Sequence, residues 1–146
     1  MRRALLLSAC LALASCGSGG QRLSKKEYAK RADAVCARYK REQPTLANPA
    51  NVTVKQVADL GSRTLPLLDR TIAQLRKLEP PKDEQRLADQ WLSALDRSRQ
   101  DAARIRDRAR ANDLKGVTAL VAPANRDDRA ASDLAAQLGM SVCSRP

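Results

Sequence analysis

Histidine and phenylalanine are absent from this chain of 146 residues, and aromatic residues make up only 2% of it. The lack of imidazole excludes His-dependent acid–base catalysis, phosphohistidine transfer and every mixed Cys/His zinc site. So few aromatic side chains also argue against a conventional aromatic-rich β-sandwich core. The length is sufficient for one ordinary domain and too small for two comfortable ones.

Acidic residues are outnumbered by basic ones, with 16 Asp and Glu against 27 Lys and Arg, which gives a formal net charge of +11. A basic surface attracts anions, and the available anion depends on the compartment: nucleic acid inside the cell, lipid headgroups and wall polymers outside it. The N-terminal sequence therefore bears directly on the class of partner.

The N-terminus has the pattern of an export signal. Two arginines follow Met1, and a largely apolar run over residues 4–14 is too short to span a bilayer as a stable helix. The sequence Leu-Ala-Ser-Cys at 13–16 resembles a bacterial lipobox. This resemblance implies that residues 1–15 are a lipoprotein signal peptide and that Cys16 becomes the lipidated N-terminus. Residues 16–23 would then be the lipidated cysteine and a flexible tether, and 24–146 the folded domain.

Two other interpretations of this region remain. Cys10 follows a loosely similar tetrapeptide, but a cut before it would leave an unusually short apolar run. An ordinary secretory peptide with an incidental cysteine is the second. Both alternatives still predict export.

Cysteine usage then predicts a covalent link. If Cys10 leaves with the signal and Cys16 carries lipid, Cys36 and Cys143 remain, and an exported protein is expected to join them. A metal held by these two thiolates alone is the weaker alternative, because no histidine is present to complete the site. We expect a Cys36–Cys143 disulfide, no metal, and no cofactor besides the diacylglycerol lipid on Cys16.

Capping patterns and helical periodicity predict four helical segments. Ser24 and Thr53 each precede Glu or Gln by three residues, which is the capping-box pattern of a helix start. Apolar residues then recur at steps of three and four, so each helix buries one stripe. The third segment, roughly 82–111, has the most regular stripe, from Ala88 through Trp91 to Ala109.

Prolines, caps and a glycine set the limits of these helices. Pro66 is expected to bend the second segment without dividing it, whereas Pro123 should bend or break the fourth, which Asp113 caps. Pro81 is expected in the first turn of the third helix, and Gly139 should stop the last one. Short connections favour antiparallel neighbours. The predicted fold is all-α, an antiparallel four-helix bundle with the disulfide joining the first helix to the C-terminal tail.

Few side chains are candidates for chemistry. Trp91 is expected to anchor the core. Pairs three residues apart, such as Asp101 and Arg104, should form weak ion pairs on the outer surface of the third helix. The apolar stripe of the fourth segment passes through Asp127 or Asp128, and we expect these acids to meet solvent or pair with arginine rather than act as catalysts. No serine has the partners of a nucleophile, so no enzymatic activity is expected.

Three further motifs mark the chain: Ala-Asp-Ala-Val-Cys at 32–36, Leu-Glu-Pro-Pro at 78–81 and Leu-Gly-Met-Ser-Val-Cys at 138–143. Together with the lipobox, they make the chain similar to the small exported helical lipoproteins that are common in actinobacteria. The resemblance covers nearly the whole chain. It implies this layout and a lipid-anchored location on the outer face of the cytoplasmic membrane, but no functional residues.

The expected function is that of a non-catalytic, membrane-anchored lipoprotein that contacts an envelope protein or an anionic wall polymer. Nucleic acid is not an expected partner of an exported protein. Arg99, Arg106 and Arg110 are the candidates for contact with an anionic surface. The alternative is an extracytoplasmic small-ligand binder or sensor, which a sizeable closed cavity in the bundle would favour. A densely packed core with an exposed basic surface would favour the contact protein.

Overall fold

The structure is a computed structural model that describes residues 22–46 and 51–145. Within these ranges it contains α1 (Lys25–Glu42), α2 (Val54–Leu75), α3 (Gln85–Arg110) and α4 (Leu114–Gln137), one short 3₁₀ helix, η1 (Lys82–Glu84), and no strand. The expected all-α fold is confirmed. Residues 1–21, which include Cys16 and Cys10, lie outside the described residues.

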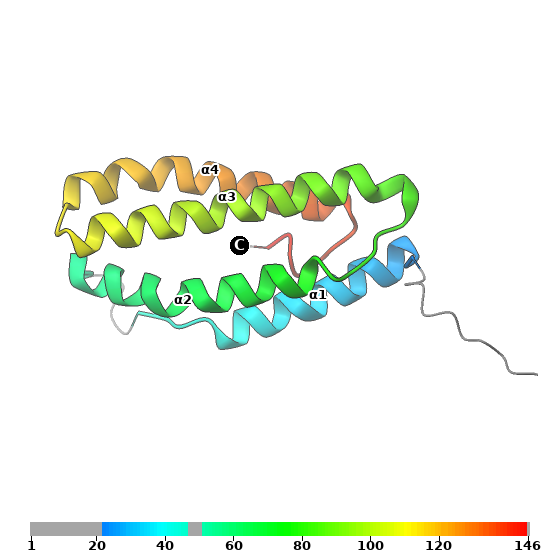
Figure 1. The fold of residues 1–146 in the computed structure, drawn as a ribbon, viewed down its shortest axis with the longest axis horizontal. Coiled ribbons are helices and arrows are strands. Elements are labelled where there is room, and N and C mark those ends of the chain that lie inside the picture. The colour runs from blue at the N-terminus through cyan, green and yellow to red at the C-terminus, as the bar shows by residue number, and fades with distance from the viewer. Residues whose placement is uncertain (1–21, 47–50, 146) are drawn as a thin grey trace, which may run out of the picture.

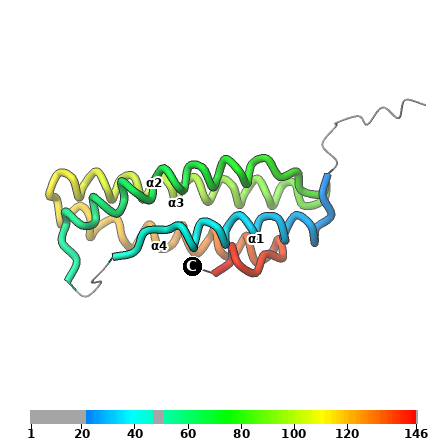
Figure 2. Tube along the Cα trace, turned by 90° about the horizontal axis from the view of Figure 1, so that it is seen from below, coloured from blue at the N-terminus to red at the C-terminus, as the bar shows by residue number. Residues whose placement is uncertain are grey.

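The helices lie lengthwise beside one another as a helical bundle. α3 packs against both α2 and α4, and α1 packs against α2. Figure 1 shows α1 and α2 in the lower part of the bundle and α3 and α4 in the upper part, and Figure 2, seen from below, has α1 and α2 in front. Because two helices flank α3, it is covered on two sides.

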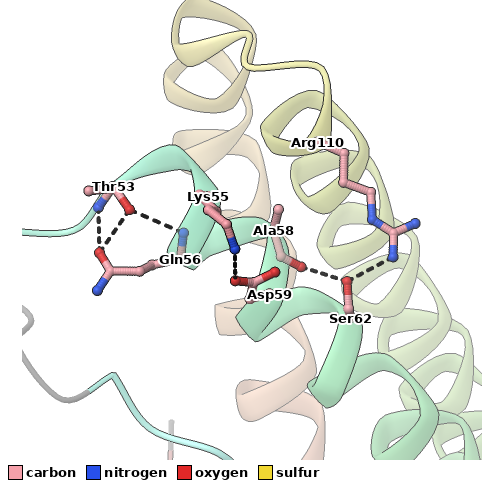
Figure 3. Close-up of polar contacts among 7 residues, drawn as sticks. All are labelled: Thr53, Lys55, Gln56, Ala58, Asp59, Ser62 and Arg110. Carbon is pink, nitrogen blue, oxygen red and sulfur yellow. Dashed lines mark hydrogen bonds and ion pairs between the residues drawn. The ribbon is translucent and has the colours of Figure 1, made fainter.

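α1 and α2 begin where the sequence predicts, at two capping boxes. The Ser24 hydroxyl accepts from the backbone N–H of Glu27 at 3.3 Å, and the Glu27 carboxylate accepts from the backbone N–H of Ser24 at 3.4 Å. Thr53 and Gln56 make the same pair of contacts at 3.2 and 2.8 Å (Figure 3). Each box satisfies two backbone amides that have no partner within the helix.

Neither internal proline divides its helix. α2 continues through Pro66, as predicted, and α4 continues through Pro123, so the break that the sequence allowed there does not occur. Proline removes one hydrogen bond, here the one to the carbonyl of Ala119. Ala119 is exposed, so water can satisfy that carbonyl while the rest of the helix stays intact.

The third helix starts later than predicted. Pro81 has extended backbone, with ψ at 153°, and stands before η1 instead of in the first turn of α3. The backbone N–H of Glu84 bonds to the Pro81 carbonyl at 3.0 Å, which forms the tighter turn of η1 before α3 begins. The other predicted ends hold: Asp113 caps α4 through the Gly116 N–H at 2.8 Å, and Gly139 has a φ of +80°.

The core has two centres. The larger one lies where α2 ends and α3 begins, and the smaller one lies near the α3–α4 turn around Ala58, Ala109 and Val117. Each large side chain that is fully buried stabilises the fold by roughly 1.5–3 kcal/mol. The largest side chains of the first centre, each at most 2% exposed, are Tyr28, Leu75, Trp91, Leu138 and Met140. The predicted anchor role of Trp91 is confirmed.

Candidate functional site

The C-terminal segment folds back against α1. After Gly139 ends the last helix with a positive φ, Met140 enters the larger core centre, and residues 141–145 lie beside α1 (Figure 2). Three side chains of α1 hold this segment: Asp33, Cys36 and Lys40. We call these three residues and 141–145 the C-terminal clasp.

The covalent part of the clasp is the predicted disulfide. Cys36 and Cys143 are bonded, with their Cα atoms 5.4 Å apart, within the usual range for such a link. The bond joins positions 107 residues apart in the sequence. One turn further along α1, the Lys40 ammonium donates to the backbone carbonyl of Arg145 at 2.6 Å.

Asp33 is the polar part of the clasp, a role that was not predicted from the sequence. One carboxylate oxygen accepts from the backbone N–H groups of Val142 at 2.8 Å and Cys143 at 3.0 Å. The other accepts from the backbone N–H of Ser141 at 2.8 Å and from its hydroxyl at 2.9 Å. The available signal was its position in Ala-Asp-Ala-Val-Cys, three residues before Cys36, which places both on one helix face.

These contacts set the ionisation of Asp33. Burial alone would raise its pKa, but the backbone N–H groups of the tail outweigh that effect and hold the pKa of Asp33 below its usual range. The carboxylate is therefore ionised at neutral pH and binds the tail with charge-assisted hydrogen bonds.

The three arginines predicted to contact an anionic surface lie along the contact between α2 and α3. The Arg99 guanidinium donates to both carboxylate oxygens of Asp69 at 2.8 and 3.2 Å. Arg110 donates to the hydroxyl of Ser62 at 2.9 Å (Figure 3). Arg106 pairs with the adjacent Asp107 at 2.7 Å.

The stem of Arg106 also marks a close approach of these two helices. A Cβ placed on Gly61 of α2 would lie 2.8 Å from the Cβ of Arg106 on α3. Only glycine allows the two backbones to come this close. The structure thus brings the three arginines to one helix contact, where two of them hold α2 directly. A role for them on an anionic surface stays a prediction.

The buried acid of this bundle is Asp101, and the prediction of an ion pair on the outer surface of α3 is wrong for this residue. Asp101 is 1% exposed, whereas Asp128 is exposed and Asp127 is partly exposed and 3.6 Å from Arg97. Asp127 and Asp128 thus meet solvent or pair with arginine, as expected, although the partner of Asp127 lies on α3, and the core-facing carboxylate is on α3 as well. The reason is that α3 packs on both α2 and α4, so its buried arc is wider than a single stripe.

Only one of the two carboxylate oxygens of Asp101 has a polar partner. One carboxylate oxygen forms an ion pair with Arg104, whose own side chain is 56% exposed. The second oxygen and the hydroxyl of Ser98, one turn earlier, are buried without a hydrogen-bond partner. Asp101 follows the buried Ala94 by seven residues and so shares its helix face, and this face lies outside the stripe that the sequence predicted.

The hydroxyl of Tyr28 is a third buried side-chain oxygen without a hydrogen-bond partner. Its burial, with a smaller contribution from the charge of Asp89, raises the pKa of Tyr28 to about 12. The phenol is therefore neutral across the physiological range and acts as a core residue.

Two hollows stand out in the described part of the chain. The larger, about 810 Å³, is an open groove on the outside of α3 that also touches Leu134 of α4. Its polar lining includes Lys82, Arg86 and Arg97. The smaller, about 20 Å³, lies between α1 and α2, with Arg38 and Arg70 among its lining residues. Neither is an enclosed cavity of the size that the small-ligand alternative requires.

No group of three potential metal ligands comes together in residues 22–46 and 51–145. Among the described helices, none is long and apolar enough to cross a membrane. Comparison of the chain with protein-family models, with curated proteins and with solved structures gave no match.

Proposed function

We propose that this protein is an exported, lipid-anchored protein of the cell envelope. Residues 1–15 direct export, Cys16 carries a diacylglycerol lipid, and residues 24–146 form an antiparallel four-helix bundle on the outer face of the cytoplasmic membrane. The bundle is non-catalytic and acts through contacts with an envelope protein or an anionic envelope polymer.

The observation that carries this proposal is the Cys36–Cys143 disulfide within the clasp. Structural disulfides persist in oxidising compartments and are rare in the cytosol. Asp33 and Lys40 hold the same tail segment with hydrogen bonds, so α1 fixes the tail on both sides of the disulfide. Taken with the lipobox resemblance at 13–16, this arrangement supports export.

The antiparallel arrangement is supported by the short connections. Residues 111–113 join α3 to α4, and residues 76–84 join α2 to α3. Connections of this length favour neighbouring helices that run in opposite directions.

Action through the outer surface is supported by the shape of the hollows. The groove on α3 is open, and the cleft between α1 and α2 is far smaller than ligand pockets of roughly 300–1,000 Å³. The small-ligand alternative therefore depends on the open groove alone. A thermal-shift screen with small anions would reveal such a ligand by a rise in melting temperature, which Arg86→Ala should abolish.

The test of the proposed function is the intact mass of the protein recovered from its native membrane fraction, with thiols blocked and without reduction. We expect a chain that begins at Cys16, carries a diacylglycerol group and has no blocked thiol on Cys36 or Cys143. A chain that begins at Met1 with alkylated cysteines would contradict the proposal and would place the protein in the cytoplasm.

A further inference from the structure

Unpaired positive charge in this bundle is concentrated on α1 and α2. On α3, five of the seven arginines, those at 97, 99, 104, 106 and 108, each face an aspartate within 4.0 Å. Across the described residues, by contrast, the basic side chains of α1 and α2 that lack any such ion pair include Arg31, Arg38, Arg41, Arg63 and Arg70. We call these five residues the α1–α2 basic face.

The imbalance arises because the acids of α1 and α2 are engaged elsewhere. Glu27 is held in the cap of α1, and Asp33 is held by the tail. Asp59 pairs with Lys55 (Figure 3), and Asp69 pairs with Arg99 of α3. Glu42 alone has no such partner in the described part of these two helices, and it lies in the cleft between them.

The geometry makes these arginines one continuous surface. Arg38 and Arg70 line the two sides of the same narrow cleft between α1 and α2. On α1, Arg31 precedes Arg38 by seven residues and Arg41 follows it by three. On α2, Arg63 precedes Arg70 by seven, so the arginines of each helix share one side of it. All five side chains are exposed. Figure 2 shows α1 and α2 together on one face of the bundle, with α3 and α4 behind.

The predicted anchor is close to this face. α1 begins at Lys25, so the chain between Cys16 and α1 reaches at most about 30 Å when fully extended. α1 has 18 residues and is therefore about 27 Å long. Electrostatic attraction to a membrane extends only about 8 Å at physiological salt, so the whole basic face can act only if the bundle lies flat.

We propose that the α1–α2 basic face docks on anionic phospholipid headgroups and lays the bundle flat on the membrane that carries its lipid anchor. This inference rests on the proposed function through the position of Cys16. It replaces Arg99, Arg106 and Arg110 as the anionic-surface residues, because two of those three hold α2 and the third pairs with its neighbour. A free wall polymer remains an outcome of the test.

The experiment uses the full mature protein, purified from membranes and reconstituted in vesicles of phosphatidylcholine with or without phosphatidylglycerol. Arginines are modified with a dicarbonyl reagent, and the rate at each residue is measured by peptide mass spectrometry. With phosphatidylglycerol at low salt, we expect modification of the five arginines to slow by about threefold or more. High salt should abolish the difference.

Arg126 and Arg129 of α4 are internal controls, because both are exposed and free of ion pairs in the described structure, and they lie away from the buried residues Val117, Ala131 and Ala135. Their rates should be equal on both vesicles.

Two triple variants that change the net charge of the protein by the same amount give a second readout. Arg31→Glu/Arg38→Glu/Arg70→Glu should remove the slowing at Arg41 and Arg63, while Lys115→Glu/Arg126→Glu/Arg129→Glu should preserve it.

Three outcomes would overturn the inference: equal rates on both vesicles, slowing at Arg126 and Arg129 to the same extent, or slowing by soluble polyphosphate but not by vesicles. The last would assign the face to a polymer. The intact mass of the same sample tests the anchor separately. An unlipidated chain would contradict the proposed function, whereas a lipidated chain with equal rates on both vesicles would overturn this inference alone.

Discussion

Asp33 makes the densest set of hydrogen bonds in the C-terminal clasp, because a single carboxylate receives three backbone N–H groups and one hydroxyl from the tail. We expect Asp33→Asn to lower the free energy of unfolding by about 1 kcal/mol or more at pH 7, since an amide offers one acceptor oxygen and no charge. Urea unfolding measures this change. Asp133→Asn, at an exposed position on α4, is the control and should change little.

The same contact predicts a pH dependence. The pKa of Asp33 is lowered in the folded state, so its contribution is complete above the unfolded pKa of about 4 and is lost as pH falls through the lower folded value. The stability difference between the native protein and Asp33→Asn should therefore shrink below about pH 4. A difference that stayed constant down to pH 2 would show that the charge of Asp33 is not involved.

Asp101 and Arg104 test the cost of a buried charge. Arg104→Ala leaves the buried carboxylate without a counter-charge and should destabilise the fold by about 3 kcal/mol. Asp101→Ala removes a carboxylate with an unpartnered oxygen and leaves an arginine that is largely exposed, so it should be far less harmful. The double variant should resemble Asp101→Ala. Equal losses in both single variants would contradict this account.

At the scale of the element, helix ends were predictable and helix faces only in part. The caps at Ser24, Thr53 and Asp113 are local patterns that span four residues, and the structure contains all three caps. The buried face of α3 depends on which helices flank it, and that information is not local. The stripe through Trp91 is correct, but Asp101 lies on the side that α3 buries in addition.

The role of Asp33 was missed for a related reason. Its partners lie more than 100 residues away, and the hydrogen bonds are made by backbone N–H groups of the tail. Backbone groups carry no sequence signature. Cys143 was predictable because it shares a rare residue type with Cys36, whereas Asp33 is one of several charged residues of α1 and only its spacing from Cys36 marks it.

The contact of α2 with α3 gives a prediction for Gly61. Gly61→Ala would gain roughly 1 kcal/mol of helix propensity, but its Cβ would press on Arg106 at 2.8 Å. We expect a net loss of about 1 kcal/mol, because the two helices must move apart. Ala73→Gly, at an exposed position of α2, measures the propensity effect alone. If Gly61→Ala stabilised the protein as much as Ala73→Gly destabilised it, the close approach would be unimportant.

At the scale of the whole molecule, the disulfide is the largest single constraint. Its loop spans 107 residues, for which loop-closure entropy gives a stabilisation of roughly 4–5 kcal/mol. The variant Cys36→Ser/Cys143→Ser should melt at a markedly lower temperature than the oxidised protein in calorimetry. The unmodified protein in reductant should behave like the variant. An unchanged melting temperature in both samples would show that the disulfide does not stabilise the fold.

The position of this bond also determines how the molecule would respond to mechanical load. Cys36 lies in α1, and Cys143 lies in the last segment that the structure describes. If the chain is pulled between a residue before Cys36 and a residue after Cys143, the force passes from α1 directly through the two sulfur atoms. Residues 37–142 form a closed covalent loop outside this path, so α2, α3 and α4 would bear no tension, and a stretched molecule could lengthen only by unwinding the chain outside that loop.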